Sequence, residues 1–430
     1  MEYTPMVALC LLATPLITAM LWSSVASRYM RSTYSKSQPS LDDLPDDIIL
    51  EICALLKNST SVKERRDARY NNRPRSFKQE LNRIDCWDFS WKFLLMKRPR
   101  RYTPLKALSG TSRRMRQLAA PDLFRAVLIE HDWNWNQALS GLDCMNNSAA
   151  AHDYAESFSI QLWLEDSWYD WWKDDSMHRG PRPPRRLAPR LADVLRKLER
   201  IHDLTLNIPE YHTEVFRKAF QKTNVTLPCV KTLVLGPHMD WVIAMCPNVE
   251  RISSGGNWLH SNVDGDYKHR HSFELVRSAG TASNLKHLEV FEWWSEEHLD
   301  WVLQYTPWIE SLAMPGGNYS SSIRKLLPTL SRLTNLKSLV LADASSLHVG
   351  FDPPGCGNCY MGPGGEQYRL QVAAEGRRAT ERVARTVFAR LRTLKELWVG
   401  DYSKAVVVRT ASGAVEEVVW TYGHRLRTCK

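Results

Sequence analysis

Glycine is scarce in this chain and proline is no more frequent than usual, with 20 Gly and 22 Pro among 430 residues, which excludes a collagen-like or low-complexity protein. Long apolar runs are scarce too. Only the stretch from Tyr3 to Ser27 is uncharged and long enough to span a bilayer, so a polytopic membrane protein is excluded. The nine cysteines are scattered and do not form the dense framework of a small secreted domain. At the usual ~100–200 residues per domain, two or three globular domains are expected.

Catalytic motifs are absent from the sequence. Neither H-E-x-x-H nor G-x-S-x-G occurs, and no Gly-Lys-Ser/Thr follows the glycine-rich run 362–365 to make a phosphate-binding loop. Residues 322–325 match S-x-x-K by letters, but the other signatures of those hydrolases are missing. We therefore predict that the chain is not an enzyme and has no cofactor.

Two groups of metal-binding residue types are present, and neither predicts a metal site. His269 and His271 lie beside two aspartates, but this polar run is loop-like and lacks a helical frame, so ordinary loop residues are expected. Cys356 and Cys359 form a C-x-x-C pair within a Gly/Pro-rich run, but no second pair completes the about four ligands of structural zinc. A turn in a flexible insertion is favoured over zinc.

The apolar and charged residues that are present indicate a folded, locally basic protein. Hydrophobic residues make up 43% of the chain and there are 17 Trp, enough for a substantial core. The net charge is +10, yet residues 57–116 alone carry 18 basic and 5 acidic residues, leaving the remainder at −3. A nucleic-acid surface over the whole protein is therefore not expected. Nucleic-acid binding through residues 65–116 remains a weaker alternative.

The hydrophobic segment at residues 1–27 has three interpretations. Residues 6–26 are long enough for one membrane span, and the basic residues that follow would place the rest of the chain in the cytoplasm. The small-x-small sequence at 24–26 instead suits a cleaved signal peptide. Translation from Met30 would remove the segment altogether. Four glycosylation sequons, at Asn58, Asn146, Asn224 and Asn318, bear on the secreted alternative.

Two amphipathic segments follow the polar linker at residues 28–43. The first, residues 44–56, has proline in its opening turn and apolar residues at helical spacing. The second, residues 105–119, also has one apolar face and is predicted to be a single helix, and 121–129 follow as a helical turn passing into a strand. Their letters are L-P-x-x-I-x-x-x-I-x-x-L and L-x-x-L-S-x-x-S-R-R-x-R-x-L-A-x-P-x-L-F-R-x-V-x-I.

This pair of motifs resembles an F-box, particularly the fungal type. The resemblance implies a small helical F-box over residues 44–130, interrupted by a basic insertion at 58–104. Such an insertion of about 45 residues costs little entropy in a surface loop. The resemblance also implies a face that docks on a Skp-type adaptor. Its residues would be Leu44, Pro45, Ile48, Ile49, Ile52, Leu108, Ser112 and Leu118.

From residue 131 to 430, short strands alternate with helices. Strand-like cores lie at 204–206, 233–235, 252, 288–290, 312–314, 339–341 and 397–399, and three of them have the form L-x-x-L-x-L. Their mean spacing is close to the about 20–29 residues of leucine-rich repeats. Residues 240–250 also match 300–310, displaced by 60, and each copy is expected to be a helix ended near its proline and followed by a strand.

The fold class predicted is therefore α + α/β: a small helical F-box, then a region that resembles an irregular leucine-rich-repeat solenoid. Insertions are expected near 163–190, which is rich in tryptophan and acidic residues, and near 342–378. An ordinary α/β domain with parallel strands is the alternative to the solenoid.

The resemblance is to the substrate-receptor subunits of SCF (Skp–cullin–F-box) ubiquitin ligases. It implies a cytoplasmic or nuclear adaptor that binds a Skp-type protein, through it cullin, and a protein substrate that the sequence does not identify. The concave strand face and the Trp-rich insertion would hold that substrate. The runner-up is a membrane-tethered or secreted leucine-rich-repeat-like protein that only binds ligands.

Overall fold

The computed structural model describes residues 44–56, 104–132, 135–163, 182–254, 265–291, 294–315, 319–354, 360, 364–400, 403–410 and 412–422. The chain divides into two compact units, Met1–Ile52 and Cys53–Lys430. In the first unit, residues 46–52 begin a helix that runs on to residue 56. The second unit holds the remaining described elements.

The helices of the second unit are distributed along its whole length. The α-helices are α4 (Pro104–Ser109), α5 (Arg113–Phe124), α6 (Trp135–Asn146), α7 (Ala149–Tyr154), α8 (Leu187–Lys197), α9 (Thr213–Thr223), α10 (Gly265–Ala279), α11 (Glu296–Tyr305), α12 (Ile323–Leu330) and α13 (Gly365–Arg390). Short 3-10 helices are η4 (Glu210–His212), η5 (Asp240–Met245) and η7 (Ala344–Leu347).

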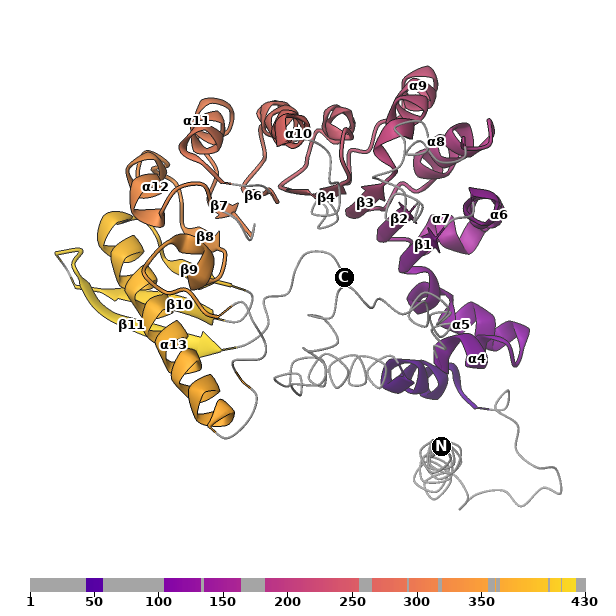
Figure 1. Ribbon diagram of the computed structural model, residues 1–430. Coiled ribbons are helices and arrows are strands. Elements are labelled where there is room, and N and C mark those ends of the chain that lie inside the picture. The colour runs from indigo at the N-terminus through magenta and orange to yellow at the C-terminus, as the bar shows by residue number, and fades with distance from the viewer. Residues whose placement is uncertain are drawn as a thin grey trace, which may run out of the picture. The chain divides into compact units, whose positions relative to one another are not determined.

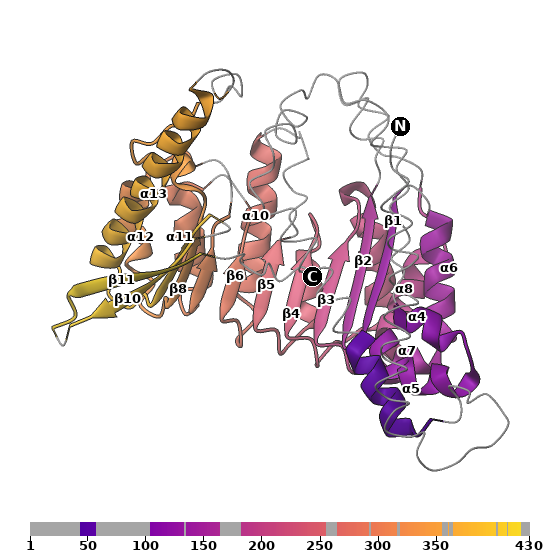
Figure 2. The same cartoon turned by 90° about the horizontal axis from the view of Figure 1, so that it is seen from below.

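The strands form one mixed, open sheet of 11 strands in sequence order. They are β1 (Ala126–Asp132), β2 (Ser157–Trp163), β3 (Asp203–Asn207), β4 (Thr232–Leu235), β5 (Arg251–Ser254), β6 (His287–Glu289), β7 (Ser311–Ala313), β8 (Ser338–Leu341), β9 (Glu396–Val399), β10 (Ser403–Arg409) and β11 (Val415–Tyr422). Strands β1 to β9 pair in parallel, whereas β10 pairs antiparallel with β9 and β11. Figure 2 shows the strands side by side, and Figure 1 shows α6 and α8 to α12 on one side of them.

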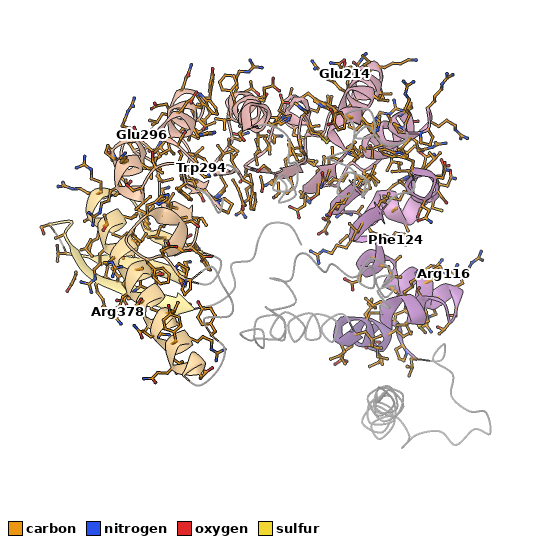
Figure 3. All side chains as sticks on the ribbon, viewed as in Figure 1. Arg116, Phe124, Glu214, Trp294, Glu296 and Arg378 are labelled. Atoms are coloured by element: carbon orange, nitrogen blue, oxygen red, sulfur yellow. The ribbon has the colours of Figure 1, made fainter. Side chains whose placement is uncertain are left out.

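The strands form where they do because alternate residues are buried against the helices. Leu233, Leu288, Leu312, Leu339 and Leu397 at the centres of their strands are each at most 1% exposed. Burying a leucine stabilises the fold by about 1.5–3 kcal/mol. Charged side chains lie on the exposed side of the helices, as Figure 3 shows for Glu214 on α9 and Glu296 on α11, away from the sheet.

The same turn leads into seven of these strands. A buried aliphatic residue lies three positions before each central leucine or isoleucine, and its N–H donates to the carbonyl three residues earlier at 3.1–3.5 Å. These residues are Ile201, Val230, Val249, Leu285, Ile309, Leu336 and Leu394. The predicted strand cores are therefore all strands, and the first leucine of L-x-x-L-x-L is a buried turn residue.

The 60-residue self-match corresponds to equivalent places in two units. Val249 and Ile309 are both buried, and the following Glu250 and Glu310 both donate their N–H to a lysine carbonyl of the preceding unit at 2.8 and 2.9 Å. Both copies are a helix followed by a strand, as predicted: the 3-10 helix η5 precedes β5 in the first copy, and α11 precedes β7 in the second.

Three predictions about elements are wrong. The single helix over 105–119 is broken into α4 and α5, because Ser112 leaves the helical conformation and caps α5. Residues 365–378 of the expected insertion form the first half of α13. Strands β2, β10 and β11 lack the leucine motif and were not expected.

Several predictions lie outside the described residues: the hydrophobic segment 1–27 and linker 28–43, most of the basic insertion 58–104, residues 164–181 of the Trp-rich insertion, and the Cys356–Cys359 pair. Within the part of the chain that is described, no helix combines the length and the apolar character that crossing a bilayer requires.

Candidate functional site

The face of the sheet opposite the buried leucines carries a hollow of about 360 Å³. Small-ligand pockets have volumes of about 300–1,000 Å³, so this hollow is large enough to accept a few side chains. It extends from β4 to β10, and most of its lining residues alternate in sequence with the core leucines. This face is therefore the candidate binding surface of the second unit.

Parallel register arranges the lining residues in two rows. Because neighbouring strands pair residue by residue, each position of one strand lies beside the same position of the next. The first row is Thr232, Arg251, His287, Ser311, Ser338 and Glu396. The second row contributes Ser253, Glu289, Ala313, Val340 and Trp398, beside Lys404 of β10. Both rows are mostly polar or small, unlike the opposite face.

One end of the hollow is held by a small hydrogen-bonded group. Glu396 accepts a hydrogen bond from the Ser338 hydroxyl at 2.9 Å and pairs with Lys404. The Lys404 ammonium also lies 5.8 Å from the centroid of the Trp398 ring. Burial acts to raise the pKa of Glu396, but the bonds from Lys404 and Ser338 outweigh it and the pKa is lowered. Glu396 is therefore ionised and already paired at neutral pH.

Arg251 of β5 and Glu289 of the neighbouring β6 bring opposite charges to the hollow. Burial and the adjacent Arg251 guanidinium lower the pKa of His287, so the imidazole is neutral at neutral pH. Arg251 is itself exposed, and no carboxylate of the described residues lies within 4.0 Å of its guanidinium. Arg251 can therefore pair with an acidic group of a binding partner.

A row of ion pairs borders the hollow where the strands begin. Glu250 bridges Lys231 at 3.5 Å and Lys286 at 3.3 Å, and Glu310 pairs with Lys337 at 3.0 Å. The hydrogen bond from Lys286 lowers the pKa of Glu250. Exposed pairs of this kind contribute about 0–1 kcal/mol each to stability. They therefore stabilise the sheet little, and their main effect is to place positive and negative charges in a defined order along this edge.

The residues predicted to bind an adaptor are divided between the two units. Leu44, Pro45, Ile48, Ile49 and Ile52 belong to the first, and Leu108, Ser112 and Leu118 to the second. Ile49 is only 1% exposed and is a core residue, whereas the other seven are partly exposed.

Ser112 has a structural role as the N-cap of α5. Its hydroxyl accepts a hydrogen bond from the N–H of Met115 at 3.2 Å. Losing such a cap costs about 0.5–2 kcal/mol of stability. A substitution of Ser112 would therefore change helix stability as well as adaptor binding, and a binding assay would not separate the two effects.

The structure also contradicts the prediction for the His269–His271 run. These residues belong to α10, not to a loop. The helix brings His271 and Glu274 to His238, and these three are the metal-binding side chains that the described part of the chain gathers together.

Comparison with known proteins gives no relative for this chain. No family model matches it, and no curated protein matches it significantly.

Sequence reasoning found the strands that form the hollow but not the residues that line it. The signal was present, because the lining residues occupy the variable positions of the leucine motif. His287 and Glu289 are two of the three variable positions in the motif that begins at Leu285. Reading these positions across successive motifs would have predicted both rows.

Proposed function

We propose that the chain is a substrate-recognition subunit of an SCF-type ubiquitin ligase and that it catalyses nothing itself. The F-box-like motifs at 44–57 and 105–129 support this proposal, as does their order, ahead of the stacked strand–helix units. Seven of those units enter their strand through the same turn and bury a leucine or isoleucine in it. This repetition supports an irregular leucine-rich-repeat solenoid.

The observation that carries the proposal is the open face of the sheet. A face lined by Arg251, His287, Glu289 and Trp398 presents charge, hydrogen-bonding groups and an aromatic ring in one hollow. Protein interfaces use such mixtures, with arginine and tryptophan among their usual anchors. A protein segment with acidic residues would complement Arg251.

In this proposal the protein works by proximity. The F-box would dock on a Skp-type adaptor bound to cullin, while the sheet face holds the substrate beside a ubiquitin-loaded enzyme. Tethering of this kind raises the effective concentration of one reactant near another without new chemistry. A cytoplasmic or nuclear location follows from the proposal, and Cys144 and Cys229 are exposed free thiols, which suit a reducing compartment.

The test is a pull-down of the full chain with a purified Skp-type adaptor. The wild-type chain is expected to bind, and the double variant Ile48→Asp plus Leu108→Asp is expected to bind more than about 100-fold more weakly, because two carboxylates would be buried in an apolar interface. Both positions are only partly buried, so the substitutions spare the core. The matched control is Val406→Asp plus Val408→Asp, at side chains that are 38% and 41% exposed on β10.

Failure of the folded wild-type chain to bind would refute the F-box assignment. Equal loss in the β10 control would show that the effect is a general one of added charge. In either case the ligand-binding repeat protein, membrane-tethered or secreted, becomes the better proposal.

A further inference from the structure

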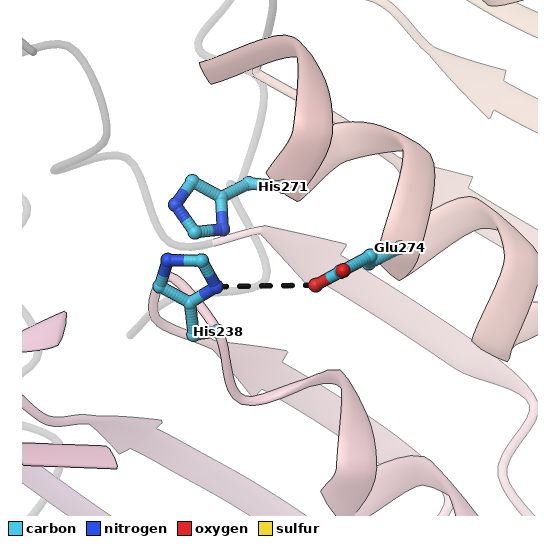
Figure 4. Close-up of side chains that lie close together, drawn as sticks. All are labelled: His238, His271 and Glu274. Carbon is cyan, nitrogen blue, oxygen red and sulfur yellow. Dashed lines mark ion pairs between the residues drawn. The ribbon is translucent and has the colours of Figure 1, made fainter. Parts of the chain in front are cut away.

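Three metal-binding side chains meet beyond the carboxyl end of β4, and none of them lines the hollow of the sheet face. His271 and Glu274 lie three residues apart on α10, so they share one face of that helix. His238 comes from the loop that follows β4. Figure 4 shows the two imidazole rings and the carboxylate turned toward one another. The fold therefore joins a strand end and a helix that are far apart in the sequence.

The distances are close to those of a coordination sphere. All the ligand atoms lie within 4.8 Å of one another, and Nδ1 of His238 is 3.9 Å from a carboxylate oxygen of Glu274. Bonds of about 2.0–2.1 Å from a tetrahedral zinc ion place neighbouring ligand atoms about 3.4 Å apart. The two imidazole rings meet edge to face with centroids 3.2 Å apart, so they would rotate away from each other to seat an ion between their nitrogen atoms.

The backbone directs His238 toward the helix. Its φ is 53°, in the left-handed region that non-glycine residues adopt only at an energetic cost. The loop around it is anchored on both sides: the N–H of Gly236 donates to Leu206 at 2.8 Å, and the buried Met239 accepts a hydrogen bond from Val242 at 3.0 Å. The fold thus fixes the backbone from which the His238 side chain projects toward α10.

We propose that His238, His271 and Glu274 bind a divalent transition-metal ion, with Zn²⁺ as the preferred ion. Two imidazoles and one carboxylate form a known three-ligand set for zinc, which leaves a fourth position for water. Calcium and magnesium prefer oxygen ligands alone, and Fe²⁺ binds nitrogen sites more weakly than Zn²⁺ does.

Access to the site is compatible with this proposal. His271 is 5% exposed, whereas the side chains of His238 and Glu274 keep 24% and 25% exposure. The ion would enter from the exposed side and find one buried ligand beneath it. Because the ligands come from β4's loop and from α10, the bound ion would tie two successive strand–helix units together.

The test is metal binding by the full chain after treatment with a chelator. Equilibrium dialysis against Zn²⁺ gives the number of bound ions, and Co²⁺ as a substitute reports a four-coordinate nitrogen–oxygen site by its visible absorption. The variants are His238→Asn, which tolerates the left-handed backbone, and Glu274→Gln, which keeps the side-chain size. Each variant is expected to bind one zinc ion fewer than the wild type, because its affinity at this site falls more than about 100-fold. Even substitutions of outer-shell residues lower metal affinity 10–100-fold.

Matched controls are His202→Asn, just before β3, and Glu297→Gln on α11, both at exposed positions away from the site. Zinc bound by cysteines or histidines elsewhere is the same in all variants and cancels in the comparison. Circular dichroism establishes that each variant is folded. Loss of one equivalent in both site variants, with the controls unchanged, supports the site. Wild-type affinity in either site variant overturns the proposal, as does a wild-type chain that binds no zinc.

Discussion

The hydroxyl of Tyr319 links the ends of two neighbouring strands, and removing it tests how the strand–helix units are held together. Tyr319 is 4% exposed and donates to the carbonyl of Met314, just after β7, at 2.6 Å. It also accepts a hydrogen bond from the N–H of Ala342, just after β8, at 3.3 Å. Burial raises the pKa of Tyr319 well above its ordinary value, and the bond from Ala342 opposes this only in part, so the hydroxyl stays protonated.

The variant Tyr319→Phe removes both bonds and keeps the ring. A carbonyl at Met314 and an N–H at Ala342 are then left buried, since these residues are 0% and 6% exposed. Each unmet buried polar group costs about 1–3 kcal/mol, so the free energy of unfolding is expected to fall by about 2–4 kcal/mol. Packing changes little, because phenylalanine fills nearly the same volume.

Urea unfolding followed by circular dichroism measures this loss. The control is Tyr368→Phe on α13, where the side chain is 38% exposed and the expected change is within about 0.5 kcal/mol. If the two variants unfold at the same urea concentration, the hydroxyl does not join the units and the reasoning is refuted.

Two further predictions concern titration and helix termination. The pKa of His287 is lowered from its ordinary 6.5 by burial and by Arg251, so its contribution to stability is complete above that value and declines as the pH falls below it. In urea titrations between about pH 7 and pH 5, His287→Gln should therefore lose less stability than the wild type, and equal losses would contradict the argument. Asn224 ends α9 with a φ of 47°. Asn224→Ala should lower the thermal midpoint by the equivalent of about 1–2 kcal/mol whereas Asn224→Gly should not, and equal midpoints would show that the left-handed cap carries no strain.

The strands that the sequence predicts correctly are those whose leucines are buried against the helices. Leu288 and Leu339 illustrate why. Each is at most 1% exposed, so few other side chains fit at its position, and the leucine motif can be recognised in the sequence. Strand β2 buries Phe158 and Ile160 in the same alternating way, but it carries no leucine motif and so is not predicted from that motif. The hairpin β10–β11 also lacks the motif, and Gly413 marks its turn with a φ of 81°.

Features that depend on contacts between distant segments could not be predicted. The first half of α13 follows a Gly/Pro-rich run and is largely exposed, so it lacks the apolar face that identifies a helix. It does make one tertiary contact that the local sequence does not reveal, because Gly376 lies so close to Phe351 that an added methyl group would meet the ring at 3.1 Å. The meeting of His238 with His271 likewise depends on where α10 packs, which no local pattern encodes.

The contrast between fixed and variable positions also bears on what the sheet face binds. Leucines of the motif are fixed because replacing one with alanine would cost about 2–5 kcal/mol. The variable positions need only suit the neighbouring strand, as Glu396 does by pairing with Ser338 and Lys404. Arg251 departs from this rule, since within the described residues it has no such carboxylate partner although it lies in the same hollow. An exposed arginine that makes no ion pair within the described residues is free to pair with an acidic group from outside, so under the proposed function an acidic first contact is expected.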